Sequence, residues 1–482
     1  MPARTGEQFL EGLKDSRELW VDGERVRDVA SHPALAGAAH TLAEIFDVQH
    51  AHRAACLVPD PETGEPINAS HLVPRARVHL ERRRACLERV AERAVGIMGR
   101  TPDYMNVTFA GFAGRDDEWG AFGNEAGAAN LVRFQKELRR NDWSLTHTII
   151  HPTIDKSVQD VLGGGGDVAL HKVENTARGI LVRGARILAT LAPFADELAV
   201  YPGHPIPPTG GQRYALAFSI PVATPGLKFL CRDSVSRGTN RFDHPLSSRF
   251  DEQDAFVIFD DVEVPRERIF IDGNVDVYNQ VLTTGWYPNV MQQTTIRAHT
   301  KLEFAYALGC KMAELIGDKS PATMELLGEL VGYAELTRAA LRTAEAEAFH
   351  WGNGVWFPNG DPLVQLRHFL PMWFPRVNEI LRLIGSHNLL ATPTESQIRD
   401  PELGPLIARY LQGAGGASAE QRIRVFRLAW DFVGSALGGR GEQYERFYLA
   451  SAARNRLLAH LFAPKDRGRK LVEQFLEEKS LD

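Results

Sequence analysis

The period of the hydrophobic pattern changes twice along this chain, and that change limits its folds more than any other feature. Up to about Arg139, apolar residues recur near every 3.6 positions, as in amphipathic helices. From about Leu145 to Gly273 the period shifts toward two, as in strands, and from Val275 the helical pattern returns. We therefore expect an N-terminal helical domain over 1–144, a middle β domain over 145–274 and a C-terminal helical bundle over 275–482.

Local signals place several elements in the first part. Asp22-Gly23 between apolar residues predicts a hairpin over Trp20–Val26. The spacing of apolar residues from Pro74 to Met98 predicts one long helix. Thr101-Pro102-Asp103 resembles a helix start, with a capping hydroxyl and a proline at the first position. A helix should begin at Pro102, with Arg100 just outside it and Tyr104 in its first turn.

Short strands and then long helices are expected beyond this point. The strands are separated by glycine- and proline-rich turns, which favours a small antiparallel barrel or sandwich. They are predicted at Gly179–Arg183, Arg186–Ala189, Leu198–Tyr201, Tyr214–Ile220, Lys228–Cys231 and Phe256–Phe259. Helical patterns follow at 293–318, 320–351, 363–388, 418–437 and 442–462.

Composition excludes several classes of protein. The 482 residues are 44% hydrophobic and carry a net charge of −6, so neither a disordered chain nor a nucleic-acid binder is indicated. The four cysteines are scattered, which is typical of reduced thiols and of no zinc knuckle. There is no apolar leader and no apolar run long enough for a membrane span. We expect a cytoplasmic protein without a metal.

Two candidate motifs remain ambiguous from residues alone. Gly164–Ala169 fits G-x-G-x-x-A, but no βαβ unit surrounds it, so a flexible loop is favoured over a nucleotide site. No Walker phosphate motif is present. His147 and His151 stand four apart, yet the glutamate of H-E-x-x-H is missing and Pro152 disfavours a helix there. A zinc site and a structural histidine in an extended segment are both compatible with this spacing.

Arg100 and Tyr104 also allow two interpretations. Both could face one cleft beside the positive end of a helix, where an arginine and a hydroxyl would bind an oxyanion. A surface Arg–Asp pair with a packed tyrosine explains the same residues.

At these residues the sequence resembles the 4-hydroxyphenylacetate 3-monooxygenase family. The matching segments occur in the family's order over nearly the whole chain: Arg4–Leu10, Arg100–Tyr104, Leu145–Thr148, Gly184–Thr190, Phe256–Pro265, Gly438–Arg440 and Tyr444–Tyr448. The resemblance implies an acyl-CoA dehydrogenase-like fold, mainly α, with an N-terminal helical domain, a middle β-barrel and a C-terminal four-helix bundle.

The resemblance also implies a function. Such proteins are oxygenase components of two-component flavin monooxygenases. They receive reduced FAD from a separate NAD(P)H-flavin reductase, and with O₂ they form a C4a-hydroperoxyflavin that hydroxylates a phenolic substrate ortho to its hydroxyl, giving a catechol. A homotetramer, built as a dimer of dimers, is implied as well.

Residue roles follow from the same match. Arg100, Tyr104 and His147 would surround the phenolic oxygen as catalytic residues, and Thr190 would hydrogen-bond near the flavin N5. Pro202 and Gly203 align with the place where hydroxyl side chains hold the substrate carboxylate in relatives. The expected cofactor contacts are His147, Thr148, Ile149, Thr153, Ile154, Asp155, Lys156, Thr190, Arg440, Tyr448, Leu449, Ala450 and Ser451.

Two departures from the family bear on the substrate. Pro202 and Gly203 lack hydroxyls, so we expect a different or larger phenol, such as a tyrosine-derived one, with the 203–211 loop as its gate. An ordinary surface turn is the alternative for that loop. Tyr104 together with Gln292-Gln293 favours ortho-hydroxylation over dehalogenation.

Three other functions are weighed on the same fold. A 4-hydroxybutyryl-CoA dehydratase needs a C-x-x-x-C pair, which is absent, and an acyl-CoA dehydrogenase would leave Arg100 and Tyr104 unexplained. A catalytically silent binding or scaffold protein would fail to bind reduced FAD.

Overall fold

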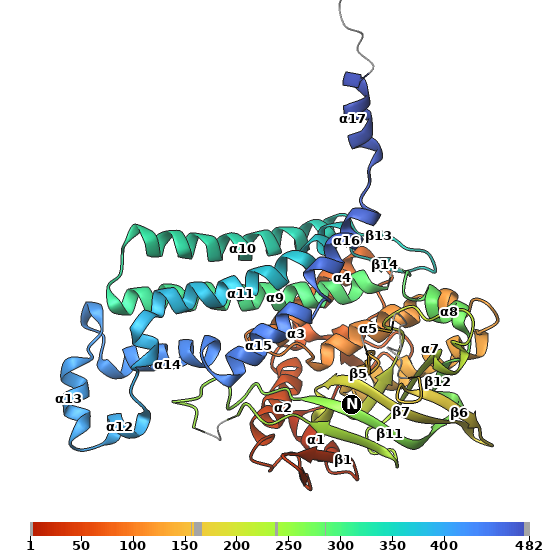
Figure 1. Ribbon diagram of the computed structural model, residues 1–482, viewed down its shortest axis with the longest axis horizontal. Helices are drawn as coiled ribbons and strands as arrows, with labels where there is room; N and C mark the ends of the chain where they lie inside the picture. The colour runs from red at the N-terminus through yellow and green to blue at the C-terminus, as the bar shows by residue number, and fades with distance from the viewer. Residues whose placement is uncertain (1–2, 156, 159–165, 237–239, 285, 477–482) are drawn as a thin grey trace, which may run out of the picture.

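A computed structural model describes residues 3–155, 157–158, 166–236, 240–284 and 286–476 of the chain. The expected cofactor contact Lys156 and the first glycines of the Gly164–Ala169 motif lie outside these ranges. Helices dominate the described residues, and the strands gather in the middle of the sequence, as the periodicity predicts (Figure 1). No helix among the described residues is both long and apolar enough to span a membrane.

The first part is helical with two small β elements. The predicted hairpin is confirmed, with Asp22 and Gly23 both at positive φ in its turn. Its first strand also pairs in parallel with β10 (Leu227–Cys231), which the local pattern did not predict. The elements are α1 (Gly6–Gly12), β1 (Glu18–Val21), β2 (Glu24–Arg25), α2 (Ala36–Ala51), α3 (Arg53–Cys56), β3 (Leu57–Pro59), β4 (Pro66–Asn68), α4 (Arg77–Arg93), α5 (Pro102–Gly114), α6 (Asp116–Trp119) and α7 (Glu125–Asn141).

Helix α5 begins at Pro102 as predicted, but its cap is not the expected one. The Thr101 side chain makes no capping hydrogen bond. Asp103 is buried, and its Oδ2 accepts a hydrogen bond from Gln293 of the C-terminal part at 2.9 Å. The start of α5 is therefore held by a contact between distant parts of the chain rather than by a local cap.

The middle strands form two sheets. One has six strands in the order β2-β1-β10-β11-β7-β6, and the other has four in the order β12-β9-β8-β5. An isolated bridge between Ile150 and Ile187 joins the segment after β5 to β7. Pairing among the described residues closes no ring, so the barrel is not confirmed. The strands are β5 (Leu145–Thr148), β6 (His171–Asn175), β7 (Gly179–Thr190), β8 (Glu197–Val200), β9 (Leu216–Pro221), β10 (Leu227–Cys231), β11 (Asp254–Pro265) and β12 (Ile269–Asp272).

Strand β7 corrects one prediction. The two strands expected at Gly179–Arg183 and Arg186–Ala189 are one strand. Gly184, between them, has a φ of 119°, and a Cβ there would lie 2.5 Å from the Ala169 carbonyl oxygen. The glycine that suggested a break thus lets the strand bend while it stays paired with β11.

The last part is a helical bundle. Helices α9, α10 and α11 pack on one another, and α14, α15 and α16 pack on α11. The elements are α8 (Val275–Gln280), α9 (Tyr287–Ile316), α10 (Pro321–Ala346), β13 (Phe349–His350), β14 (Trp356–Phe357), α11 (Gly360–Leu390), α12 (Glu395–Arg399), α13 (Leu403–Tyr410), α14 (Ala419–Val433), α15 (Ala436–Phe447), α16 (Ala452–Phe462) and α17 (Asp466–Leu476). Figure 1 shows α17 standing away from the body.

The bundle differs from the sequence prediction near its end. The single helix expected at 442–462 is divided into α15 and α16. Ala450 has a φ of 68°, and Ser451 caps the new helix by accepting a hydrogen bond from the backbone N–H of Arg454. The break falls at Tyr448–Ser451, where cofactor contacts are expected.

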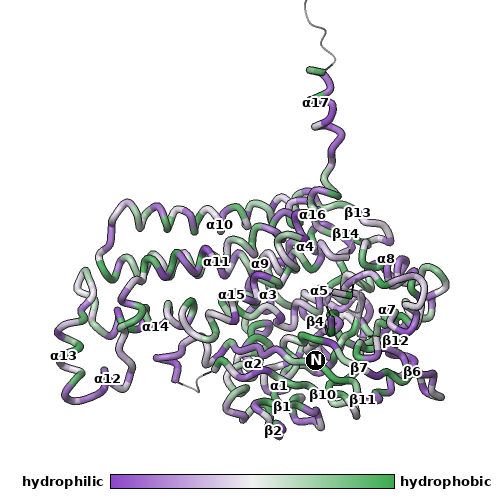
Figure 2. Tube along the Cα trace, in the orientation of Figure 1, coloured by the Kyte–Doolittle hydropathy of each residue, from purple (hydrophilic) through white to green (hydrophobic). Residues whose placement is uncertain are grey.

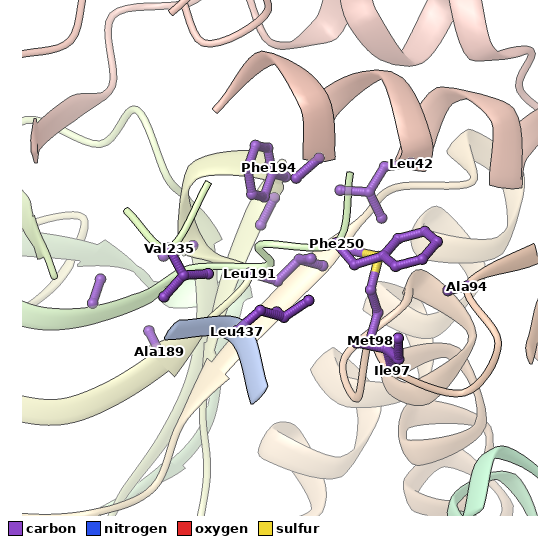
Figure 3. Close-up of a cluster of buried hydrophobic side chains, with 14 of the residues drawn as sticks. Leu42, Ala94, Ile97, Met98, Ala189, Leu191, Phe194, Val235, Phe250 and Leu437 are labelled. Atoms are coloured by element: carbon purple, nitrogen blue, oxygen red, sulfur yellow. The ribbon is translucent and has the colours of Figure 1, made fainter. Parts of the chain in front are cut away.

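One buried apolar cluster joins the three parts of the chain (Figure 3). Met98 comes from the N-terminal part, Ala189 and Leu191 from β7 and the turn after it, and Leu437 from α15. These residues are 3% exposed or less. Because they neighbour Arg100, Thr190 and Arg440 in sequence, the cluster fixes three candidate site residues relative to one another.

Candidate active site

The three residues expected around an oxyanion lie together. The rings of Tyr104 and His147 stack with centroids 5.5 Å apart, and the Arg100 guanidinium lies 4.0 Å from the centroid of Tyr104. Arg100 precedes α5, Tyr104 lies in its first turn, and His147 lies on β5. The surface-pair interpretation of Arg100 is wrong, since its guanidinium contacts aromatic rings.

Arg100 is surrounded by tyrosines. Tyr448 lies 4.3 Å and Tyr444 5.9 Å from its guanidinium, measured to the ring centroids. Burial alone lowers the pKa of Arg100, but the neighbouring phenol groups, Tyr104 first, outweigh it and raise that pKa above the ordinary value. The guanidinium therefore stays cationic, and a bound oxyanion is stabilised by it.

The backbone at Arg100 is fixed by a carboxylate from the middle part. Glu252 is fully buried and accepts hydrogen bonds from the backbone N–H groups of Gly99, at 2.9 Å, and Arg100, at 3.0 Å. Tyr448 donates its hydroxyl proton to the Gly99 carbonyl at 3.0 Å. A Cβ at position 99 would lie 2.6 Å from the Tyr444 hydroxyl, so glycine is required for this close approach.

The proton affinity of His147 is unlike that of an ordinary histidine, whose pKa lies near neutral pH. Burial, followed by the charge of Arg100, instead lowers the pKa well below 6.5, so the ring is neutral at neutral pH. Its Nδ1 is buried and has no hydrogen-bond partner.

The zinc alternative for His147 is not supported. His147 lies on a strand and His151 follows it outside any helix, so the i, i+4 geometry does not arise. The described residues contain no cluster of three or more His, Cys, Asp or Glu side chains that could hold a metal ion.

Thr190 lies at the end of β7, in a strained stretch of backbone. Leu188 and Leu191, on either side of it, have φ values of 67° and 75°, and Gln253 opposite has 56°. Residues other than glycine adopt such values at a cost, and they concentrate at functional sites. The Thr190 hydroxyl lies 2.7 Å from Asp254 Oδ1, and its carbonyl accepts a hydrogen bond from Thr146.

Arg440 is engaged within the chain. Its Nε and Nη2 bind both oxygens of Asp254, and its Nη1 donates to Glu252 at 2.8 Å. Its guanidinium also lies 4.1 Å from the centroid of Tyr444. The contact of Arg440 with FAD stays a prediction. Within the chain Arg440 joins the carboxylates that hold Thr190 and the backbone of Arg100.

The remaining expected cofactor contacts differ in burial. Thr148 is buried, Ile149 is half-buried, and Thr153, Ile154 and Asp155 are exposed. Tyr448, Leu449, Ala450 and Ser451 form the break between α15 and α16.

These residues fit a flavin on two observations. A flavin ring needs both apolar surface and polar groups that lack partners in the protein. Ile154 is 62% and Leu188 45% exposed although both are apolar, and His147 Nδ1 lacks a partner.

Pro202 and Gly203 follow Tyr201, whose ring lies 5.4 Å from that of His147. Burial raises the pKa of Tyr201 well above its ordinary value, so its hydroxyl stays protonated beside Tyr104. A Cβ at Gly203 would lie 2.7 Å from the carbonyl oxygen of Ile149. Arg454 of α16 donates to His204 Nδ1 at 2.9 Å, which ties the 203–211 loop to the bundle.

Sequence reasoning missed several residues that build the site. Glu252 lies two residues before β11, Asp254 is the first residue of β11, and Tyr201 directly follows β8. The acidic pair at the start of a strand was the only local signal for Glu252 and Asp254. Tyr444 lies in Tyr444–Tyr448, a segment that matches the family, but the sequence analysis assigned it no role.

Comparisons with known proteins agree over the whole chain. A model described as 4-hydroxyphenylacetate 3-hydroxylase N terminal matches residues 5–271, and its C-terminal counterpart matches residues 277–477. A 4-hydroxyphenylacetate 3-monooxygenase oxygenase component from Thermus thermophilus is 36% identical, covering 99% of this chain and 98% of the relative. A Streptomyces globisporus monooxygenase that acts on a carrier-bound (3S)-3-amino-3-(3-chloro-4-hydroxyphenyl)propanoyl group is 32% identical, covering 94% and 86%.

Solved structures give the same result. A 4-hydroxyphenylacetate 3-monooxygenase oxygenase component, solved with FAD and 4-hydroxyphenylacetate, superposes with a TM-score of 0.93 at 36% identity, covering 98% of each chain. An archaeal 4-hydroxybutyryl-CoA dehydratase reaches a TM-score of 0.89 at 16% identity, covering 100% of this chain and 96% of the other, which shows a shared fold alone.

Proposed function

Since this chain belongs to the 4-hydroxyphenylacetate 3-hydroxylase family, we propose that it is the oxygenase component of a two-component flavin monooxygenase. It hydroxylates a phenol ortho to its hydroxyl. The overall reaction consumes the phenol, O₂ and reduced FAD, and yields a catechol, water and oxidised FAD. The single observation that carries this assignment is the contact that Arg100 and His147 both make with the ring of Tyr104.

These three residues prepare the phenol for attack. Arg100 stabilises negative charge on the phenolic oxygen, and Tyr104 donates a further hydrogen bond to it. The neutral ring of His147 offers its unpaired Nδ1 as a hydrogen-bond acceptor to the phenol O–H. A phenolate is more electron-rich than a phenol at the ortho carbon, which makes that carbon the site of oxygen transfer.

The cofactor is held beside the phenol by two stretches of chain. One side is formed by His147, Thr148, Ile149, Thr153, Ile154 and Asp155, with Thr190 at its edge. Tyr448, Leu449, Ala450 and Ser451 close the other. When bound, reduced FAD supplies the two electrons that activate O₂. The tyrosines around Arg100 exclude water from the reacting atoms.

The substrate is a phenol that differs from, or is larger than, 4-hydroxyphenylacetate. Pro202 and Gly203 offer no hydroxyl to a carboxylate. The 203–211 loop gates this end of the site, and the contact between Arg454 and His204 holds the gate against α16. The carrier-bound substrate named for the Streptomyces relative supports a phenol with an extended side chain.

The wider assembly completes the proposal. We assign an N-terminal domain to 1–144, a middle β-barrel domain to 145–274 and a C-terminal bundle to 275–482. A separate NAD(P)H-flavin reductase supplies the reduced FAD. A homotetramer, built as a dimer of dimers, is supported by exposed apolar side chains on α16 and α17. In Figure 2, α17 stands clear of the body and carries both green, hydrophobic segments and purple, hydrophilic ones. The exposed apolar side chains include Leu457, Leu461, Phe462, Leu471, Val472 and Phe475.

One experiment tests the central assignment. The purified protein is mixed anaerobically with reduced FAD and a panel of para-substituted phenols, and then with ¹⁸O₂. We expect at least one catechol that carries a single ¹⁸O atom. Failure to bind reduced FAD would remove the assignment. So would recovery of all the reducing equivalents as hydrogen peroxide with every phenol tested.

A further inference from the structure

Arg186 is a buried cation without a counterion. It lies on β7 and is fully buried, and its Nη1 donates to the Ile149 carbonyl at 3.0 Å. Its Nε and Nη2 make no hydrogen bond, and no carboxylate within the described ranges forms an ion pair with it. Burial lowers the pKa of Arg186, and the nearby Tyr278 opposes this only with a phenol, which carries no charge at neutral pH. An arginine stays cationic in proteins, and a buried charge without a partner is costly, so the two donors point to a bound anion.

Two histidines beside Arg186 add neutral donors. His151 is 5% exposed, and neither of its ring nitrogens has a partner among the residues described. Burial, followed by the charge of Arg186, lowers the pKa of His151 to about 3, so its ring is neutral. Burial and the charges of Arg454 and Arg186 also lower the pKa of His204. Because Arg454 can only donate, His204 Nδ1 accepts its N–H, and the proton of the neutral ring lies on Nε2 as a donor.

This cluster lies next to the rings of the candidate active site. Ile149, whose carbonyl binds Arg186, follows His147 by two residues. Gly203 packs on the same Ile149, since a Cβ at position 203 would lie 2.7 Å from its carbonyl oxygen. Gly203 in turn follows Tyr201 by two residues, and the Tyr201 ring lies 5.4 Å from that of His147. Both sides of the cluster are therefore joined to this pair of rings by short stretches of chain.

We propose that Arg186, His151 and His204 bind a carboxylate at the end of the side chain of the phenolic substrate. This inference rests on the proposed function for the identity of the phenol. Nε and Nη2 lie on one edge of the guanidinium, which matches the two oxygens of a carboxylate. Since both histidines are neutral, the buried part of the cluster supplies a single positive charge. That charge balances a monoanionic carboxylate and leaves a dianionic phosphate in excess.

A bound carboxylate bridges the sheet and the 203–211 loop. Arg186 is held in the sheet by the pairing of β7 with β11, whereas His204 belongs to the loop. The primary amide of the same acid has nearly the same shape, but it has no charge and turns an N–H₂ group toward the N–H donors of the cluster. The affinity of an acid relative to its amide therefore measures this site.

The test measures binding of acids and amides without turnover. Dissociation constants of the whole protein with oxidised FAD are determined by isothermal titration calorimetry, for 4-hydroxyphenyl alkanoic acids of increasing chain length and for their primary amides. We expect at least one acid to bind about tenfold more tightly than its amide, as hydrogen bonds to a charged group allow. Arg186→Met keeps much of the volume and removes the charge, so the two affinities should become equal. Arg186→Lys should restore part of the difference, because it returns the charge without the fork.

Stability separates a binding role of Arg186 from a structural one. Arg186→Met removes an unpaired buried charge, so without a phenol its urea midpoint should equal or exceed that of the wild type. A saturating acid should raise the midpoint of the wild type but not that of the variant. Arg183→Met is the matched control, since Arg183 lies on the same strand but is exposed and paired with Asp261. It should leave the acid-to-amide ratio unchanged.

Equal affinities of the wild type for each acid and its amide would overturn this inference alone, because both compounds would still yield catechols. A ratio that Arg186→Met leaves unchanged would overturn it too, and weaker FAD binding in that variant would then assign the charge to the cofactor. If Arg186→Met does not fold, His204→Ala decides, with a fall of about threefold in the ratio expected from one lost hydrogen bond and no fall overturning the inference. A wild type that binds no phenol would overturn the proposed function as well.

Discussion

Glu252 accepts a hydrogen bond from the backbone N–H of Arg100 at 3.0 Å, although the two residues belong to different parts of the chain. The same carboxylate accepts from Arg440 of α15 at 2.8 Å. One buried side chain thus connects the residue expected to bind the phenolate, the middle strands and the C-terminal bundle. The position of Arg100 depends on all three.

Glu252→Gln should weaken phenol binding. The amide loses the charge-assisted bonds to two backbone N–H groups and to Arg440, so unfolding free energy should fall by about 2 kcal/mol. With Arg100 less well placed, KM for the phenol should rise roughly tenfold, more than kcat falls. Steady-state kinetics and urea unfolding measure both effects. Glu263→Gln, at the far end of β11, is the control and should change neither; equal KM values in Glu252→Gln and wild type would contradict the role of Glu252.

Tyr448→Phe should distinguish the contribution of the Tyr448 hydroxyl to stability from the contribution of its ring. The substitution frees the Gly99 carbonyl but keeps an aromatic ring against Arg100, so a loss of about 1 kcal/mol in unfolding free energy is expected. Tyr448→Ala should cost more and lower FAD affinity, because the ring is lost as well. Denaturant titration with the exposed Tyr410→Phe as control checks this. A phenylalanine variant as unstable as the alanine variant would show that the ring contributes nothing.

Glu197 should make stability depend on pH. Burial raises its pKa to about 7, despite Arg268 at 3.2 Å. Between these two pKa values the folded state holds a proton that the unfolded state has released. The contribution of Glu197 to the free energy of unfolding is therefore full below about pH 4.5 and declines as pH rises toward 7. The decline should total roughly 3 kcal/mol from this group. Unfolding measured from pH 5 to 8 should give a flatter profile for Glu197→Gln; a slope equal to that of the wild type would refute the assignment.

Arg454→Ala should loosen the 203–211 loop. Its contact with His204 is the hydrogen bond that joins this loop to α16, and a bond of this kind contributes about 1 kcal/mol. We expect kcat/KM for bulky phenols to rise roughly threefold relative to small ones, with more hydrogen peroxide released per turnover. Arg456→Ala on the same helix is the control. An unchanged preference among phenols would leave the loop an ordinary surface turn.

Local sequence signals predicted the elements that carry the site but not the contacts between them. Pro102 fixed the start of α5, and alternation placed His147 in an extended segment, because both depend on neighbours in sequence. Glu252 and Asp254 reach partners 150 or more residues away, or across a strand pair, and no local pattern encodes that. The break at Tyr448–Ser451 contains neither glycine nor proline, so the sequence pattern predicted one continuous helix across it.

The contribution of α15 also determines when the protein can first function during its synthesis. Arg100 and His147 leave the ribosome early, Glu252 and Asp254 later, and Arg440 with Tyr444 and Tyr448 only near the end. Until those last residues arrive, Glu252 and Asp254 lack a shared cation and Arg100 lacks two of its three tyrosine neighbours. A nascent or prematurely terminated chain therefore lacks the tyrosines that shield Arg100 from water. Such a chain cannot couple the oxidation of reduced flavin to hydroxylation, so only the completed chain yields product.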